Sequence, residues 1–254
     1  LLGGGGGIVL VPAFFYAFTA LGYGGGQVMQ VCVATSLATI VVTSIRSVSA
    51  HNRKGAVDWT VLKTWGPWLV VSAAVGVFVA TRVPSAALQA VFGVPDEKMG
   101  DGRGSAGGTR GGGGAELRHR RRRAMPGEPL RGALASGVGF FSALMGIGGG
   151  TFGVPLMTLF GMPIHRAVAT ASGFGVMIAV PAVLGFLLVD ATGAPPYTLG
   201  AVNGPAFLVV IGTTLLTTPW GVRLAHAMDP KPLKRAFAVF LTLVALNMLR
   251  KVLW

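Results

Sequence analysis

The stretch G-I-G-G-G-T-F-G-V-P at residues 146–155 decides the fold, because it interrupts a long apolar segment with residues that disfavour a helix. Glycine costs about 1 kcal/mol relative to alanine inside a helix, and four glycines occur within residues 146–150. We therefore expect the helix to break there, and Pro155 removes a further backbone donor. A related stretch, G-G-G-G-G-I-V-L-V-P at residues 3–12, ends at Pro12 and predicts a second break.

The composition around these stretches is typical of a polytopic membrane protein. Of the 254 residues, 52% are hydrophobic and 11% are charged, and the mean hydropathy is +0.66. A soluble domain carries roughly 25% charged residues. Long charge-free segments, such as the one between Arg131 and Arg166, exceed the roughly 20 residues that span a bilayer. We predict an all-α integral membrane protein with several passes.

The chain divides into two apolar halves whose segments match in the same order. The matching pairs are 3–12 with 146–155, V-A-T-S at 33–36 with V-A-T-A-S at 168–172, and Gly66-Pro67 with Gly204-Pro205. We predict about eight transmembrane helices in two four-helix repeats. The predicted spans are 1–18, 28–46, 61–80 and 84–95 in the first half, and 132–160, 167–189, 200–218 and 233–250 in the second. The first repeat covers 1–95 and is truncated at its N-terminus, and the second covers 132–254.

A segment rich in glycine and arginine, residues 96–131, separates the halves and is predicted to be a flexible linker. With four crossings per half, both repeats enter the membrane in the same direction, and most Lys and Arg residues lie on the linker's side. The positive-inside rule then places the linker, both termini and the loop near Ala194 in the cytoplasm. A re-entrant hairpin at the glycines would instead leave three crossings per half and invert the repeats.

The arginine-rich part of the linker is a candidate binding segment. Its run R-H-R-R-R-R at 118–123 could bind anionic lipid or serve only as a cytoplasmic topology anchor. We expect the lipid bilayer and a small anionic substrate as partners, and no nucleic acid.

The glycine breaks are candidate binding sites. Open N–H groups at the start of a half-helix carry partial positive charge and suit an anion. Broken helices at matching points of two repeats are typical of a transporter site near the membrane midplane. The alternative is that the glycines allow tight helix crossings. The candidate binding residues of these segments are Gly5, Gly6, Gly7, Gly148, Gly149, Gly150 and Thr151.

Polar side chains inside apolar spans are further candidates. Four hydroxyls could donate to an anion without adding charge, or could bond to a carbonyl of their own helix. Asn203 offers an amide in the third span of the second half, with a helix cap as its alternative role. The four hydroxyls belong to Thr35, Ser36, Thr170 and Ser172.

Ionisable residues are placed differently. His165 and Arg166 lie in a predicted loop, where they could attract anions to a pore mouth or be solvated loop residues. No Asp, Glu, Lys or Arg lies centrally in a predicted span, so coupling through an intramembrane carboxylate is not expected. The lone Cys32 excludes a disulfide or a Cys-based metal site. We expect no metal, no cofactor and no enzyme activity.

The segments at 146–155, 167–172, 219–226 and 233–241 resemble the TauE/SafE family of membrane permeases, often labelled sulfite exporters. The resemblance implies two four-helix repeats and transport of sulfite, an organosulfonate or another sulfur-containing anion. It also implicates the glycines of both breaks, with Pro12 and Pro155. We predict a transporter that moves a small anion by alternating access. The alternative is a non-transporting membrane scaffold or sensor that docks through the arginine-rich linker.

Overall fold

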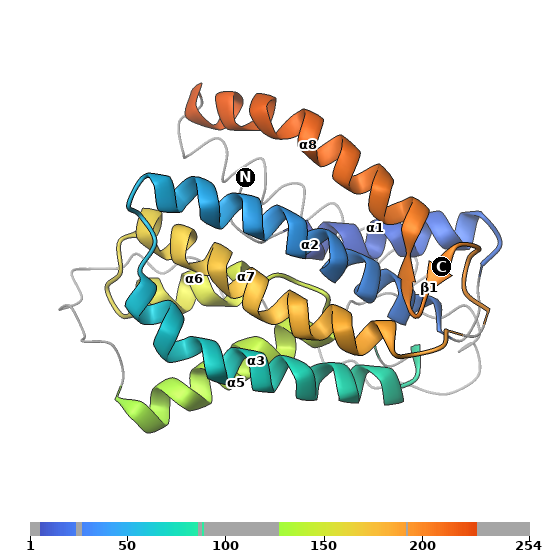
Figure 1. Cartoon of the computed structure of the whole chain (residues 1–254), viewed down its shortest axis with the longest axis horizontal. Coiled ribbons are helices and arrows are strands. Elements are labelled where there is room, and N and C mark those ends of the chain that lie inside the picture. The colour runs from blue at the N-terminus through green and yellow to red at the C-terminus, as the bar shows by residue number, and fades with distance from the viewer. Residues whose placement is uncertain (1–5, 24–26, 86–87, 89–126, 192, 228–254) are drawn as a thin grey trace, which may run out of the picture.

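The computed structural model describes residues 6–23, 27–85, 88, 127–191 and 193–227 (Figure 1). Its helices are α1 (Gly6–Ala20), α2 (Val28–Arg53), α3 (Trp59–Arg82), α5 (Glu128–Leu144), α6 (Gly150–Leu159), α7 (Ile164–Leu187) and α8 (Gly204–Ala227). A two-stranded antiparallel pair, β1 (Thr198–Leu199) and β2 (Val202–Asn203), precedes α8. The mostly helical class is confirmed for this part of the chain. The predicted spans at 84–95 and 233–250 lie almost wholly outside the described residues, so the total of eight helices stays a prediction.

Three helices, α2, α3 and α7, are long and apolar enough to cross a membrane. Helix α2 runs through the core, where Val33 and Leu37 are fully buried. Large apolar side chains on the outer helices are exposed, among them Phe78 on α3 and Leu208 on α8. A broad exposed apolar surface marks a membrane or protein contact. Here it fits a bilayer around a buried centre.

Helices α2 and α7, which carry the matching V-A-T-S and V-A-T-A-S segments, run in opposite directions (Figure 1). Thr170, early in α7, contacts Asp58, which follows the end of α2. Thr35, early in α2, contacts Asn203, which follows the end of α7. The prediction that both halves enter the membrane in the same direction is therefore wrong.

Helix α5 lies parallel to α3. A Cβ atom on Gly132, early in α5, would lie 3.2 Å from the ring of Trp68, whereas one on Gly76, late in α3, would lie 2.8 Å from the carbonyl oxygen of Phe140. Helix α7 is parallel to α3 as well, because Gly173 faces Leu62 and Gly185 faces the later Val77. Helices α3, α5 and α7 therefore all point the same way.

Helix α6 points the other way. A Cβ atom on Gly149 would lie 2.8 Å from Ile178 Cδ1, and one on Gly153 would lie 3.9 Å from Ala171 Cβ. Later residues of α6 thus contact earlier residues of α7, so the two helices are antiparallel. Helices α5 and α6 therefore form a hairpin that turns at residues 145–149. The predicted single span at 132–160 is wrong, because the glycines let the chain turn back instead of crossing.

The bundle consequently has two unlike ends. The basic end, as we name it, holds the loop 54–58 and the starts of α5 and α7. Six of the seven Lys and Arg residues whose side chains the structure describes lie near it, and Arg82 lies at the opposite end. The loop near Ala194 also lies at the opposite end, because α7 leads into it, so its predicted placement beside the linker is wrong. The six are Arg46, Arg53, Lys54, Lys63, Arg131 and Arg166.

The predicted pairing of Gly66-Pro67 with Gly204-Pro205 is also wrong. Gly204 is the first residue of α8, whereas Gly66 lies well inside α3. The residues with matching places are Asp58 and Asn203, each of which directly precedes the helix it caps.

Candidate functional site

The break after α5 is built on Gly146. Its φ of 60° lies in the left-handed region that favours glycine. The N–H of Gly146 donates to the Ala143 carbonyl at 3.3 Å, and the N–H of Ile147 donates to the Ser142 carbonyl at 2.9 Å. This pair of bonds is the glycine-ended helix terminus known as a Schellman motif. The predicted break is therefore present, and the following half-helix starts one residue before Thr151.

The two glycine stretches meet at this break. A Cβ atom on Gly7 would collide with the carbonyl oxygen of Gly146 and lie 2.7 Å from the Cα of Ile147. Gly146 in turn packs against Val33 of α2. Gly5 lies outside the described residues, and Gly6 is described only as the first residue of α1. Segments paired by sequence, 143 positions apart, thus touch in the core, where a side chain on either would not fit.

Pro12 and Pro155 do not break their helices, contrary to the prediction. Pro12 lies inside α1 and Pro155 lies inside α6. Each proline removes one backbone hydrogen bond, a loss that membrane helices tolerate when neighbouring groups compensate. The break before α6 is made at Gly146, and the residues that precede α1 lie outside the described residues.

Two of the four predicted hydroxyls donate to carbonyl oxygens. Ser36 Oγ donates to the carbonyl of Gly146 at 2.9 Å, so it binds the break itself. Ser172 Oγ donates to the carbonyl of Ala169 in its own helix at 2.6 Å. Ser172 therefore has the local role weighed as an alternative, whereas Ser36 joins α2 to the hairpin.

Thr35 and Asn203 form a contact that we name the Thr35 seam. Thr35 Oγ1 accepts the backbone N–H of Asn203 at 3.0 Å, in the buried core. Asn203 Oδ1 accepts the N–H of Ala206 at 3.0 Å, so Asn203 caps α8. Its Nδ2 donates to the Pro196 carbonyl at 3.2 Å and to Thr198 Oγ1 at 3.0 Å. Both amide donors of Asn203 are thus used, which favours the cap over substrate binding.

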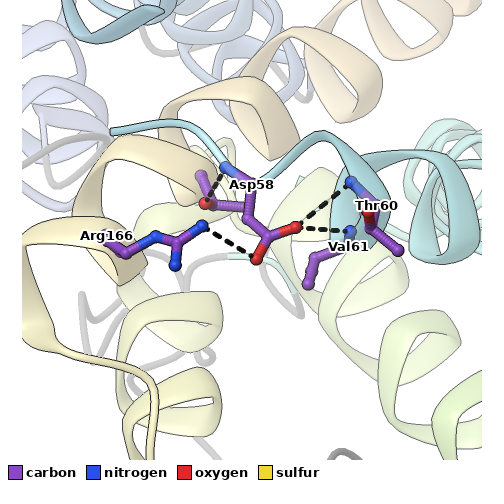
Figure 2. A network of polar contacts seen from close by, with 5 residues as sticks. Asp58, Thr60, Val61 and Arg166 are labelled. Carbon is purple, nitrogen blue, oxygen red and sulfur yellow. Dashed lines mark hydrogen bonds and ion pairs between the residues drawn. The ribbon is translucent and has the colours of Figure 1, made fainter. Parts of the chain in front are cut away.

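Thr170, Asp58 and Arg166 form the Thr170 seam. Figure 2 shows Asp58 with Arg166 on one side and Thr60 and Val61 on the other. Thr170 Oγ1 accepts the backbone N–H of Asp58 at 3.0 Å. Asp58 Oδ1 caps α3 by accepting the N–H groups of Thr60 at 3.1 Å and Val61 at 3.2 Å. The other oxygen, Oδ2, lies 3.3 Å from Arg166 Nη2. Arg166 is thus paired with Asp58. It and the exposed His165 lie in the first turn of α7 and not in the predicted loop.

Hydrogen-bond donors remain open on both sides of the break. Among the described residues, the buried hydroxyls of Ser142 and Thr151 have no hydrogen-bond partner. The N–H groups of Gly148, Gly149 and Gly150 have no backbone acceptor in this part of the chain. Sequence reasoning missed Ser142; the signal that could have found it is a hydroxyl in the apolar turn just before Gly146.

Packing constrains Gly149 as well. A Cβ atom on Gly149 would lie 2.7 Å from Phe174 Cβ. Phe174 is itself held by Trp65, with the ring centroids 5.7 Å apart. The tight helix crossing weighed as an alternative is therefore real at Gly149, and it coexists with the open N–H groups.

A separate groove of about 350 Å³ lies between the outer faces of α5 and α6. Its lining, which includes Phe141, Phe152 and Leu159, is apolar. Such a groove suits an apolar chain and not an anion. Within the described residues, no group of three or more His, Cys, Asp or Glu side chains could hold a metal ion.

Comparison with known proteins identifies the family of this chain. The model of the sulfite exporter TauE/SafE family matches residues 1–95 and 102–248. A probable membrane transporter protein of Haemophilus influenzae is 27% identical over 267 residues, covering 99% of this chain and 92% of the relative. One of Methanocaldococcus jannaschii is 26% identical over 256 residues, covering 98% and 89%. No solved structure matches the chain significantly. The chain therefore belongs to the sulfite exporter TauE/SafE family of membrane transporters.

Proposed function

We propose that this transporter moves a small anion by alternating access and binds it at the break between α5 and α6. The observation that carries the proposal is the set of open donors on the two sides of the break. They are the Ser142 hydroxyl at the end of α5, the Thr151 hydroxyl at the start of α6, and the N–H groups of residues 148–150, which have no backbone acceptor among the described residues. A helix N-terminus with open N–H groups attracts negative charge. The family description names sulfite, and we propose sulfite, an organosulfonate or another sulfur-containing anion as the cargo of this chain.

The proposed site is neutral, which sets its affinity. Hydroxyl and helix-terminus interactions contribute about 0.5 to 3 kcal/mol each. Several of them together correspond to micromolar to millimolar dissociation constants, or about −8 to −4 kcal/mol. Binding of this strength allows the anion to leave on the far side of the membrane.

The basic end is proposed to face the cytoplasm, because basic residues concentrate on that side of membrane proteins. The start of α5, which follows the linker in the sequence, lies at this end, and we therefore propose a cytoplasmic linker as well. The division into repeats at 1–95 and 132–254 and the binding of anionic lipid by residues 118–123 belong to the same proposal. Membership in a transporter family disfavours the scaffold alternative and implies that the protein is not an enzyme.

Uptake of labelled sulfite and of a labelled organosulfonate into proteoliposomes tests the function. Ser142→Ala and Thr151→Val each remove one hydroxyl with little change of volume. We expect each to weaken apparent substrate affinity about 2- to 12-fold, the equivalent of a hydrogen bond of about 0.5 to 1.5 kcal/mol.

The matched control is Thr158→Val, which removes a hydroxyl that bonds to Pro155 in the last turn of α6. It should leave the affinity unchanged. Equal affinities in wild type, Ser142→Ala and Thr151→Val would remove the break from the binding site. Absence of anion uptake by the wild-type protein would reject the function itself.

A further inference from the structure

The two seams are equivalent contacts at opposite ends of the bundle. In each, a threonine early in one helix of the antiparallel pair α2 and α7 accepts the backbone N–H of a cap residue. The cap residue starts a helix that belongs to the other half of the chain. Two contacts of one kind at opposite ends are what alternating access requires, because the ends must open in turn.

Helix α7 connects the Thr170 seam to the break. Phe174 lies one turn after Thr170 and packs against Gly149. A movement of α7 that separates Thr170 from Asp58 therefore also moves the side chain that covers the start of α6. Opening the basic end and exposing the break are thus coupled through one rigid helix.

The seams differ in charge. The side-chain amide of Asn203 donates its hydrogen bonds within its own half of the chain, to Pro196 and Thr198. Asp58 has a spare oxygen, and that oxygen crosses to Arg166 of the other half. The basic end therefore has an ionic contact between halves in addition to the hydrogen bond, whereas the Thr35 seam is neutral.

We propose that Asp58 and Arg166 are positioning residues that form a latch, which holds the basic end closed and must open during transport. The proposal rests on the alternating access proposed above. The side chains of Asp58 and Arg166 are 23% and 53% exposed. Exposed pairs contribute about 1 kcal/mol or less and are screened by salt. The latch is therefore weak enough to open in each cycle.

Cysteine accessibility tests the latch without substrate. Cys32→Ala removes the single native cysteine, and Thr151→Cys then reports exposure of the break to a membrane-impermeant thiol reagent added at the basic end. Asp58→Asn retains a good helix cap, as Asn203 does in the other seam, and loses the charge. We expect Asp58→Asn and Arg166→Gln each to raise the labelling rate about 2- to 5-fold at low salt, corresponding to an exposed pair of up to about 1 kcal/mol.

The double variant should show the same increase as either single variant, because both lose one shared interaction. High salt should raise the labelling rate of the parent protein, which carries only Cys32→Ala and Thr151→Cys, to the rate of the Asp58 and Arg166 variants. Arg53→Gln, which removes another cation of the same end, is the control and should have no effect. If Asp58→Asn does not fold, the half-exposed Arg166→Gln carries the comparison alone.

Unchanged labelling in Asp58→Asn and Arg166→Gln would overturn the latch, as would additive effects in the double variant or an equal rise in Arg53→Gln. Transport with unchanged labelling rejects the latch and leaves the proposed function standing. A wild-type protein that carries no anion rejects the proposed function, whatever the labelling shows.

Discussion

The Thr35 seam and the Thr170 seam share a hydrogen bond but differ in burial and charge. Thr35 and Asn203 are 0% and 3% exposed, whereas the carboxylate and guanidinium of the Thr170 seam are partly in water. A buried neutral seam is stable because every donor has an acceptor, and an exposed ionic one is easily released. The same valine-alanine-threonine element thus supports two contacts of unequal strength, according to the cap residue it meets.

The largest expected effect concerns which ends the seams occupy. In a Cys32→Ala background, Lys54→Cys and Asp190→Cys lie at the basic end and the opposite end. An external impermeant reagent applied to cells should label the Asp190→Cys variant and leave the Lys54→Cys variant protected. Protection of both cysteines would mean that the two halves enter the membrane in the same direction. Labelling of Lys54→Cys with protection of Asp190→Cys would mean that the basic end faces the outside.

Replacement of the cap residue should lower the free energy of unfolding more in the Thr35 seam than in the Thr170 seam. Asn203→Ala removes a helix cap and leaves the hydrogen-bonding groups of Pro196, Thr198 and Ala206 without their partner. It should therefore lower the free energy of unfolding by about 2 to 4 kcal/mol. Asp58→Ala loses a partly exposed cap and should cost about 0.5 to 2 kcal/mol. Thermal unfolding in detergent measures both. Equal losses would show that burial does not distinguish the seams.

Replacement of each seam threonine by valine should lower the free energy of unfolding less than replacement of the cap residues. Thr35→Val leaves the buried N–H of Asn203 without an acceptor and should cost about 1 to 3 kcal/mol. Thr170→Val should cost about 0.5 to 1.5 kcal/mol, because its hydrogen bond to the N–H of Asp58 is only partly buried. Thr43→Val, whose hydroxyl bonds only within its own helix, is the control for the change in shape. A larger loss in Thr170→Val than in Thr35→Val would contradict the ranking.

The smallest effect is expected for the charge alone. Asp58→Asn keeps the cap and removes one exposed ion pair, so its cost should be about 0 to 1 kcal/mol and should vanish at high salt. Unfolding temperatures of the variant and the wild type, measured at low and high salt, check this. A loss that persists at high salt would mean that the carboxylate acts through something other than Arg166.

Much of the fold was predictable because its causes are local. The apolar spans follow from composition, and the break at Gly146 follows from the poor helix propensity of clustered glycines. The family followed from the same segments. The roles of the polar residues were less predictable: Asn203 and Ser172 could each bind substrate or backbone, and which partner lies nearby is a property of the packed bundle.

Sequence alone determined that the chain is a membrane protein, that the glycines at 146–150 interrupt a helix, and that its halves share motifs. Tertiary structure alone decided that α6 turns back beside α7, that α2 and α7 run in opposite directions, and that Asp58 meets Arg166. The physical reason is that a broken helix can continue or reverse at similar local cost. Close packing of Gly149 and Gly153 against α7, together with the contact of Gly7 and Gly146, accompanies the reversal in the folded bundle.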